Sequence, residues 1–269
     1  MAEPLVSLIV AVYQGEATLR ACLNSLTAQT YPHKQIIVID GGSRDGTTAI
    51  LQAFAPQLSY WVSEPDEGIY DAWNKGLAQA QGEWIVFIGA DDRYTHAGVL
   101  ARMVEVADSA ESLDFLSAQA NTYYPDGRFH RVQGSAWNWP DYKLRLRPTI
   151  VHTGAMHHRR LFERYGPFDP KFRIAGDYDF LLRAGPYLRA AFLPEVTLER
   201  GAHGISHQQA WRAYKESYQA QRACSYIRPW EARFSLAIRV LKYRIGALKY
   251  RLQPPSGPSR LSSNGRIRA

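Results

Sequence analysis

The feature that most constrains the fold of this chain is the alternation of short apolar runs with segments of helical periodicity over its first 90 residues. Each apolar run is rich in β-branched residues, and the segments between them repeat apolar residues at three- and four-residue spacing. Strands that alternate with helices in this way are joined by crossover connections and pair in parallel. The sequence therefore predicts an α/β fold with a mostly parallel central sheet flanked by helices. The predicted strands are 5–12, 35–39, 58–62 and 84–88, and the predicted helices are 17–29, 47–55 and 69–81.

Polar loops follow the predicted strands at the points where each strand ends. Residues 13–16 follow the first strand, Asp40 ends the second, residues 64–68 follow the third, and Asp91 and Asp92 follow the fourth. In open α/β sheets ligands bind beyond the carboxyl ends of the strands, so these loops are expected to meet at one edge. Each loop alone is typical of ordinary turn chemistry. Their convergence predicts a polar, acidic binding site.

Asp91 and Asp92 have the residue type and the position of a divalent-cation site. Paired carboxylates suit Mg²⁺ or Mn²⁺, which prefer oxygen ligands and share their coordination with a diphosphate. A turn or a helix cap is the alternative interpretation of the same pair. Asp40 is similarly either a hydrogen-bond acceptor for a nucleobase or ribose, or part of a turn. Asp71 and Lys75 lie four residues apart and share one face of a predicted helix.

Four motifs follow one another within residues 4–100, and a weaker set continues further along the chain. The motifs are Tyr13–Glu16, Ile39–Thr47, Ser63–Gly76 and Gly89–Asp92, and the weaker set is Phe168–Asp169 and Ala175–Asp179. In order and spacing they closely resemble the inverting glycosyltransferase family 2, of the kind involved in bacterial polysaccharide and glycolipid biosynthesis. The motif set is specific for the family and carries little information about the substrate.

The resemblance implies a GT-A fold, which is Rossmann-like, and a nucleotide-diphospho-sugar donor, with a UDP-sugar as the default. It also implies Mn²⁺ or Mg²⁺ as cofactor, with Asp92 as the direct metal ligand. Two positions depart from the common family pattern: Gly41 stands where many members carry a second acid, and Ala90-Asp91-Asp92 stands where many have Asp-x-Asp. The residues that the resemblance places at the donor are Val12, Tyr13, Glu16, Asp40, Asp66, Asp71, Lys75 and Asp91.

An inverting transfer needs a base that takes the proton from the acceptor hydroxyl. Asp177 is the candidate, because it matches the Asp of a Glu-Asp pair in the family, although Gly176 replaces the Glu. Asp179 is the rival, at a nearby helical position that faces another direction. The alternative interpretation of Asp177 is an N-cap for the helix predicted near residues 177–185.

Three side chains are expected on the acceptor side, namely His157, Trp137 and Asp179. A zinc site is not indicated, because Cys22 and Cys224 are far apart and lack the paired spacing of zinc ligands. The same cysteine content argues against a disulfide framework and favours a reducing compartment. The histidines whose roles the sequence leaves open are His152, His157, His158, His203 and His207.

Charge is unevenly distributed along the chain, whose net charge is +7. Residues 1–100 hold five basic and eleven acidic residues, whereas residues 228–269 hold ten basic residues and one acid. This asymmetry predicts an acidic site and a basic C-terminal segment, and no nucleic-acid-binding surface. The predicted divisions are a nucleotide-sugar-binding half (1–110), an acceptor-binding and catalytic half of the same domain (111–205), C-terminal helices (206–253) and a flexible basic tail (254–269).

The segment over 233–252 predicts an amphipathic helix, which extends the fold at its C-terminal end. Its apolar stripe consists of Phe234, Ile238, Leu241, Ile245, Leu248 and Leu252. With Arg239, Lys242 and Arg244 on its other faces, it is typical of a helix that lies in a membrane interface. Packing on its own domain or on a dimer partner is the alternative, and the oligomeric state stays open. Because no spanning segment or signal-peptide pattern is found, we expect a cytoplasmic protein, peripheral on the inner face of the cytoplasmic membrane.

Other classes are less compatible with the sequence. A nucleotidyltransferase would carry a Gly-rich, Arg-containing loop after the first strand, where this chain has residues 13–17, and a Rossmann dehydrogenase would carry Gly-x-Gly-x-x-Gly there. A non-catalytic nucleotide-sugar-binding module is a further alternative, and the presence of Asp92 and Asp177 speaks against it. We therefore predict an inverting glycosyltransferase of the hexosyltransferase type, whose acceptor is a hydroxyl of a saccharide or a lipid-linked saccharide.

Overall fold

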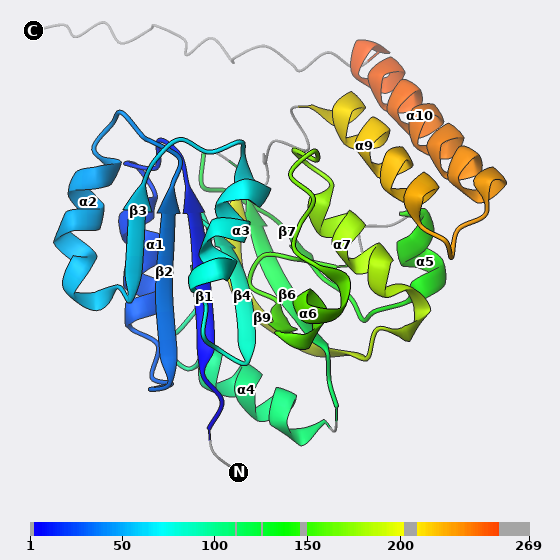
Figure 1. The fold of residues 1–269 in the computed structure, drawn as a ribbon. Coiled ribbons are helices and arrows are strands. Elements are labelled where there is room, and N and C mark those ends of the chain that lie inside the picture. Colours follow the sequence, from blue (N-terminus) through cyan, green and yellow to red (C-terminus); the bar gives the residue numbers. More distant parts are fainter. Residues whose placement is uncertain (1–2, 111, 125, 146–149, 202–208, 253–269) are drawn as a thin grey trace, which may run out of the picture.

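A nine-stranded sheet forms the centre of the computed structural model, which describes residues 3–110, 112–124, 126–145, 150–201 and 209–252 (Figure 1). The strand order is β3-β2-β1-β4-β8-β6-β9-β5, and β7 pairs with β6 outside this path. The first half of the sheet is parallel and consists of β1 (Val6–Val12), β2 (Lys34–Asp40), β3 (Tyr60–Ser63) and β4 (Trp84–Gly89).

The second half of the sheet is mixed. Its strands are β5 (Arg93–Tyr94), β6 (Phe115–Tyr123), β7 (Phe129–Gln133), β8 (Met156–His158) and β9 (Ala190–Gly201). Strand β8 is antiparallel to both β4 and β6, and it thereby joins the two halves. Strands β6 and β9 are parallel, whereas β7 and β5 pair with them in the antiparallel direction. One continuous sheet crosses the predicted boundary near residue 110. The division into a donor-binding half and an acceptor-binding half therefore stays a prediction about function.

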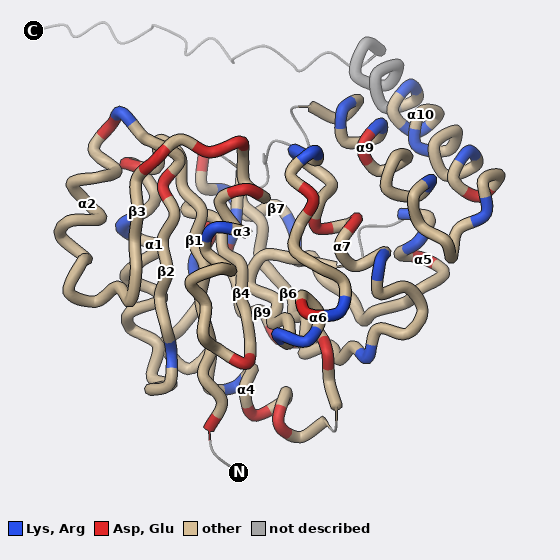
Figure 2. The backbone as a smooth tube through the Cα atoms, viewed as in Figure 1, with Lys and Arg blue, Asp and Glu red and all other residues tan. Residues whose placement is uncertain are grey.

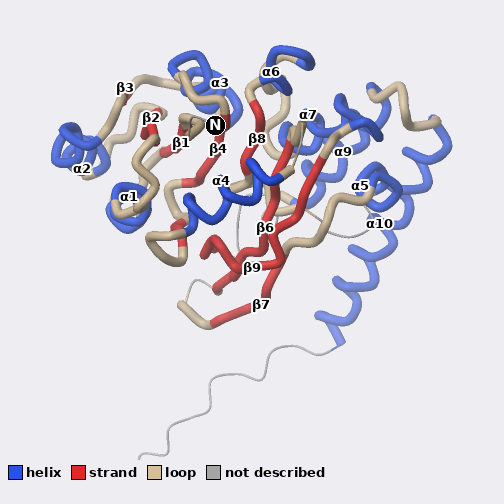
Figure 3. Tube along the Cα trace, turned by 90° about the horizontal axis from the view of Figure 1, so that it is seen from below, coloured by secondary structure: helices blue, strands red, loops and turns tan. Residues whose placement is uncertain are grey.

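Helices cover both faces of the sheet, and each face has its own apolar core. Figure 3 shows α1 and α4 on one face and α3, α6 and α7 on the other. The helices are α1 (Leu19–Thr27), α2 (Thr47–Phe54), α3 (Ile69–Gln79), α4 (Val99–Ser109), α5 (Trp139–Leu144), α6 (Arg160–Tyr165), α7 (Gly176–Ala184), α9 (Ala210–Ala223) and α10 (Pro229–Leu252). Short 3₁₀ turns follow α2 and α7 at Ala55–Gln57 and Gly185–Tyr187.

The α/β prediction is confirmed, and every strand and helix predicted in the first 90 residues is present. The periodicity of α1 shows why: Leu19, Leu23 and Leu26 are all buried against the sheet, as their spacing predicts. Figure 2 shows many Asp and Glu positions on the loops above β1–β4, and many Lys and Arg positions on α9 and α10.

The C-terminal helices pack as a pair, and α10 begins at Pro229, four residues before the prediction. Ala232, Ser235 and Arg239 form the buried side of α10, which lies against α9. The prediction that Arg239 decorates an outer face is therefore wrong, because this position points into the helix pair. In the described part of the chain, no helix has the length and apolarity to cross a membrane. The tail after residue 252 lies outside the described residues.

Candidate active site

The turn that leaves β1 carries three of the predicted donor residues. Val12 is buried at the end of the strand, and its carbonyl accepts the N–H of Gly41 at 2.9 Å. The ring of Tyr13 is 63% exposed. The Glu16 carboxylate accepts the backbone N–H of Gly46 at 3.2 Å and so ties this turn to the loop before α2. The turn thus exposes the Tyr13 ring, while the hydrogen bonds at Val12 and Glu16 hold the backbone on either side of it.

Asp40 lies at the carboxyl end of β2 and is completely buried. Its Oδ2 accepts the N–H of Ser43 at 3.0 Å and the hydroxyl of Ser63 at 2.6 Å, and its Oδ1 accepts the hydroxyl of Ser43. The carboxylate therefore holds the ends of β2 and β3 together. Since a carboxylate has about four acceptor positions, three bonds leave little capacity for a ligand.

The Asp66 carboxylate explains why a glycine stands at position 41. A Cβ atom on Gly41 would lie 2.5 Å from Asp66 Oδ2, which is closer than atoms can approach. Asp66 Oδ1 accepts the N–H of Gly68 at 2.7 Å, and this bond keeps the carboxylate in place. The Asp66 carboxylate thus occupies the space that a side chain at position 41 would need.

Asp71 and Lys75 brace the same loop from α3. Lys75 Nζ lies 2.8 Å from Glu64 Oε1, and it donates a hydrogen bond to the Pro65 carbonyl at 2.9 Å. The hydrogen bond with Glu64 raises the pKa of Lys75. Asp71 Oδ2 accepts the N–H of Glu67 at 3.0 Å. Both side chains therefore shape the loop that precedes α3.

Asp91 and Asp92, called the acid pair below, fold back against Gly89 at the end of β4. The Gly89 N–H donates to Asp92 Oδ2 at 3.1 Å, and a Cβ atom at this glycine would lie 2.9 Å from Asp91 Oδ1. Asp91 is exposed, whereas Asp92 is buried. Burial raises the pKa of Asp92 to about 6; the charge of Arg200 opposes this shift and that of Asp91 adds to it. A cation beside Asp92 would stabilise its charged form.

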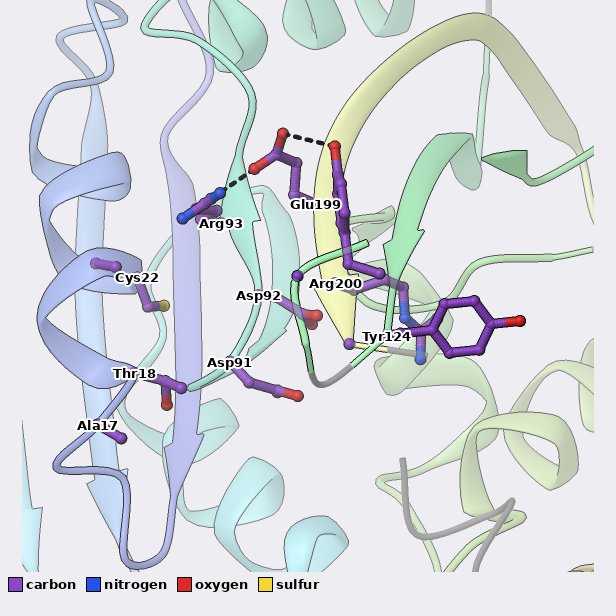
Figure 4. A pocket seen from close by; sticks show the side chains of 13 residues that line it. Ala17, Thr18, Cys22, Asp91, Asp92, Arg93, Tyr124, Glu199 and Arg200 are labelled. Carbon is purple, nitrogen blue, oxygen red and sulfur yellow. Dashed lines mark hydrogen bonds and ion pairs between the residues drawn. The ribbon is translucent and has the colours of Figure 1, made fainter. Parts of the chain in front are cut away.

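The acid pair faces a cavity of about 520 Å³ (Figure 4). One wall is formed by α1 and the other by the β6–β7 hairpin and the end of β9. Arg93 and Glu199, which are opposite each other on the paired strands β5 and β9, form an ion pair of 2.5 Å beside the cavity, and Arg200 lies next to them. The sequence analysis did not select these three residues. Arg93 directly follows the acid pair in the sequence and could have been predicted for that reason. Glu199 and Arg200 could not, because nothing in the sequence places β9 beside the acid pair.

The acid pair is the candidate site for a divalent cation in the residues that the structure describes. Among the described residues, no group of three or more His, Cys, Asp and Glu side chains could hold a metal. Mg²⁺ needs no such cage, because it binds through one or two carboxylates and completes its shell with water and phosphate oxygens. The acid pair therefore fits a cation shared with a diphosphate. His203 and His207 lie outside the described residues.

Asp177 lies in the first turn of α7 and is half-buried. Its Oδ1 accepts the hydroxyl of Tyr70 at 3.3 Å and the N–H of Tyr178 at 2.7 Å. The N-cap position belongs to Ala175, so the N-cap interpretation of Asp177 is wrong. A Cβ atom on Gly176 would lie 2.8 Å from the Tyr70 ring, which occupies the space where many family members have a Glu side chain.

Glu216 of α9 holds the segment that leads into α7. Its Oε2 accepts three backbone N–H groups, those of Arg173 at 3.1 Å, Ile174 at 2.8 Å and Ala175 at 3.1 Å. The side chain is buried, and its Oε1 accepts the guanidinium of Arg212 at 2.9 Å. One buried carboxylate thus fixes the backbone two residues before Asp177.

Two of the predicted acceptor residues do not face a ligand. His157 is completely buried on β8, with Nδ1 3.3 Å from the Ile85 carbonyl and Nε2 3.1 Å from His152. Burial lowers its pKa well below the usual 6.5. Asp179 is buried as well, and it pairs with Arg183 at 3.3 Å. The prediction that His157 and Asp179 contact the acceptor is therefore corrected, because both side chains lie in the protein interior.

Trp137, the third predicted acceptor residue, and His158 lie in different parts of the structure. Trp137 is half-buried, and its ring centre lies 4.5 Å from that of Tyr142. The charge of Asp177 acts on Tyr142, which brings Trp137 near the predicted base. His158 lies 3.3 Å from Glu83, at the amino end of β4.

A parallel sheet with an acid pair after its fourth strand, continued by a mixed second half, defines a glycosyltransferase of the GT-A fold. The chain belongs to glycosyl transferase family 2, whose model matches residues 7–166. The predicted family, fold and enzyme class are therefore confirmed.

Similar proteins support the same assignment. The PGL/p-HBAD biosynthesis glycosyltransferase of Mycobacterium bovis is 33% identical over 186 residues, which cover 68% of this chain and 70% of that protein. An uncharacterized glycosyltransferase of Mycobacterium tuberculosis is 31% identical over 212 residues, which cover 77% of this chain and 79% of that protein.

Solved structures share the fold at low sequence identity. S. aureus TarS 1-349 in complex with UDP-GlcNAc has a TM-score of 0.67 at 20% identity, covering 93% of this chain and 76% of that one. Against a longer TarS chain the match spans 46% of its length. The Pyrobaculum calidifontis mannosyltransferase PcManGT, in complex with GDP-Man and Mn²⁺, has a TM-score of 0.65 at 21% identity, covering 95% and 82%.

Proposed function

We propose that this glycosyltransferase moves a sugar from a nucleotide-diphospho-sugar, with UDP as the default nucleotide, to a hydroxyl of a saccharide or lipid-linked saccharide, with inversion. The observation that carries the proposal is the separation of two acid sites on different elements. The acid pair follows β4, whereas Asp177 begins α7 beside the start of α3 (Figure 1). An inverting transfer needs this division, because the leaving group and the acceptor are on opposite sides of the sugar.

The acid pair is the proposed site of Mn²⁺ or Mg²⁺, with Asp92 as the direct ligand. A cation bound there neutralises the charge that develops on the departing nucleoside diphosphate. Burial raises the pKa of Asp92, and a bound cation would offset this shift by stabilising the charged carboxylate. Arg200 supplies positive charge to the same cavity and is a candidate contact for the diphosphate.

The donor nucleoside is proposed to lie over the loops that follow β1, β2 and β3. Tyr13 offers an exposed ring for stacking. Asp40 and Lys75 are both engaged in hydrogen bonds that fix these loops. Their proposed contribution is therefore to hold the backbone that contacts the donor. Family 2 membership and the nucleotide-sugar complexes of the structural neighbours support this placement.

Asp177 is proposed to act as the general base. The acceptor oxygen forms a bond to the anomeric carbon while the bond from that carbon to the diphosphate oxygen breaks, and the hydroxyl proton passes to the carboxylate. Both hydrogen bonds from Tyr70 and Tyr178 go to Oδ1. This leaves Oδ2 for the acceptor hydroxyl. Trp137 is proposed as a stacking surface for the acceptor sugar, since it packs on Tyr142 near this carboxylate.

Helix α10 is proposed to attach the protein to the inner face of the cytoplasmic membrane. Phe234, Leu241 and Ile245 are each 46–58% exposed on its outer surface. An apolar groove of about 410 Å³ runs along the same helix between Arg233 and Arg244. Exposed apolar side chains flanked by cations suit an anionic membrane surface.

The test is donor binding and turnover across UDP-, GDP- and dTDP-sugars, with and without Mn²⁺. We expect one donor to bind only with the metal, and Asp92→Asn to abolish this dependence. Asp108→Asn on the exposed face of α4 is the matched control and should behave as wild type. Asp177→Asn should retain donor binding and lose about 10²–10⁴-fold in transfer rate. If no nucleotide sugar binds under any metal condition, the proposed function is wrong; if one binds without any transfer or hydrolysis, the chain is a binding module.

A further inference from the structure

Two arginines approach each other between α5, α7, α9 and α10. Arg239 of α10 is only 7% exposed, and its Cζ lies 5.3 Å from the ring centre of Tyr214. Arg145, at the end of α5, has its Cζ 4.8 Å from the ring centre of Tyr178 and donates a hydrogen bond to the Ser217 hydroxyl at 3.0 Å. Their partners Tyr214 and Ser217 lie three residues apart on α9 and therefore on one face of that helix, so both guanidinium groups lie against the same part of α9.

The described part of the chain leaves two N–H positions of the Arg239 guanidinium without acceptors. Its Nε and Nη2 are buried and have no hydrogen-bond partner. Burial and the charge of Arg145 lower the pKa of Arg239 to about 10. The tyrosine ring attracts the face of the cation but does not accept its N–H groups. A buried cation that lacks both an anion and hydrogen-bond acceptors is unfavourable, so a ligand that brings an acceptor to these N–H groups would be bound there.

The carboxylates of this corner are already engaged with other groups. Glu216 accepts three backbone N–H groups and Arg212, and Glu231 pairs with Lys143 at 2.5 Å. Asp177 is held by a tyrosine hydroxyl and a backbone N–H. Within the part of the chain that the structure describes, no Asp or Glu forms an ion pair with either arginine of the pair. An anion that completes this site would therefore have to be supplied by a ligand.

We propose that Arg145 and Arg239 bind a phosphate group carried by the acceptor. A planar guanidinium can donate two parallel hydrogen bonds to the oxygens of a phosphate, and two guanidinium groups that lack a carboxylate partner favour such an anion. The site lies on the acceptor side, because Tyr178, which contacts Arg145, directly follows Asp177 in the chain. It is separate from the cavity of the acid pair, where the donor diphosphate is proposed to bind. The inference thus rests on the proposed function and gives its acceptor a chemical class.

The phosphate has two possible carriers, and both present the same chemistry to the arginines. It belongs either to a lipid-linked saccharide at a membrane or to a phosphorylated saccharide in solution. The exposed apolar side chains of α10 lie on the helix that carries Arg239, so a lipid phosphate would reach the site as the helix meets a bilayer. The experiment therefore has a soluble arm and a vesicle arm.

In the soluble arm, inorganic phosphate is titrated calorimetrically into the full chain, with and without UDP and Mn²⁺ to occupy the donor site. Arg239→Gln and Arg145→Gln should each weaken phosphate binding about tenfold or more, while Arg164→Gln, at an exposed position of α6, should leave it unchanged. In the vesicle arm, flotation with phosphatidylcholine vesicles containing phosphatidic acid should show the same order of variants if the carrier is a lipid.

The outcomes separate this inference from the proposed function. Loss of binding in both arms identifies a lipid phosphate, and loss in the soluble arm alone identifies a soluble one. If wild type and Arg239→Gln bind phosphate equally in both arms, or neither binds, the inference is wrong and water alone satisfies the guanidinium. Thermal unfolding checks that the variants fold, and Arg145→Gln serves as the second variant at a half-buried position. Nucleotide binding, measured in parallel, reports on the donor site independently.

Discussion

Replacing Glu216 tests whether a residue far from the reacting atoms positions the base. In Glu216→Gln the three N–H groups keep an oxygen acceptor but lose its charge, and the new amide N–H₂ faces Arg212. Hydrogen bonds to a charged group contribute ~1.5–3 kcal/mol and neutral ones ~0.5–1.5 kcal/mol. A difference of about 1 kcal/mol per bond over three bonds predicts a loss of about 3 kcal/mol in the free energy of unfolding. This is a large fraction of the ~5–15 kcal/mol of a typical domain.

The effect on activity separates positioning from stability. Because Ala175 lies two residues before Asp177, loosening its backbone should displace the base and lower kcat several-fold. The KM for the donor should stay unchanged, since the acid pair does not contact Glu216. Urea titration followed by fluorescence gives the unfolding free energy, and initial rates give kcat and KM. Glu163→Gln, on the exposed side of α6, is the matched control.

The result that would refute this reasoning is a Glu216→Gln variant with the unfolding free energy and kcat of wild type. Equal losses in kcat and in donor affinity would also contradict it, because they would indicate general unfolding of the site. A more severe change, Glu216→Ala, should leave buried N–H groups without partners at ~1–3 kcal/mol each. Glu216→Ala should therefore lower the free energy of unfolding more than Glu216→Gln does, and both variants should lower kcat.

Three further predictions concern separate parts of the molecule. Gly89→Ala should abolish metal-dependent donor binding while the protein stays folded, because the added methyl group displaces the acid pair; unchanged metal titrations would contradict this. The buried His152 and His157 have depressed pKa values, so the folded pair stays neutral while the unfolded chain takes up protons below pH 6.5. The unfolding free energy should thus fall by up to ~1.4 kcal/mol per pH unit for each histidine as the pH drops from 6.5, and a double Leu variant should flatten this slope in urea titrations. Leu241→Glu should reduce flotation with anionic vesicles without changing kcat on a soluble acceptor; equal flotation would exclude α10 as the contact.

The sequence predicts the first half of the fold well, because its signals are local. Each strand there is a continuous apolar run, and each helix buries residues at helical spacing, as Ile50, Leu51 and Phe54 do on α2. The position of the acid pair after β4 follows from the same local pattern. The order of the motifs also predicts the family, and the match of the family model to residues 7–166 confirms this prediction. Specific roles at the site stay predictions until the donor experiments are done.

Contacts between distant segments explain what the sequence does not predict. His157 has a polar ring, and only the pairing of β8 with β4 makes it an interior residue. Arg239 has the spacing of an outward cation, and only the packing of α10 on α9 turns it inward. Glu216 carries no local signal either, since the N–H groups that it holds lie more than 40 residues earlier in the chain. No periodicity encodes a partner at that distance.

The order of the strands also has a consequence for how the protein matures on the ribosome. Strands β1, β2, β3 and β4 are neighbours in the sheet and come from residues 6–89, so this half can pair while the rest of the chain is still being synthesised. The second half must wait for β9, and the carboxylate that fixes the entry to α7 arrives later still, with α9. We therefore expect nascent chains to gain the donor-side loops first and the ordered base last. Pulsed hydrogen exchange on stalled chains should show protection in that sequence, and the growing enzyme would be held inactive until its C-terminal helices have docked.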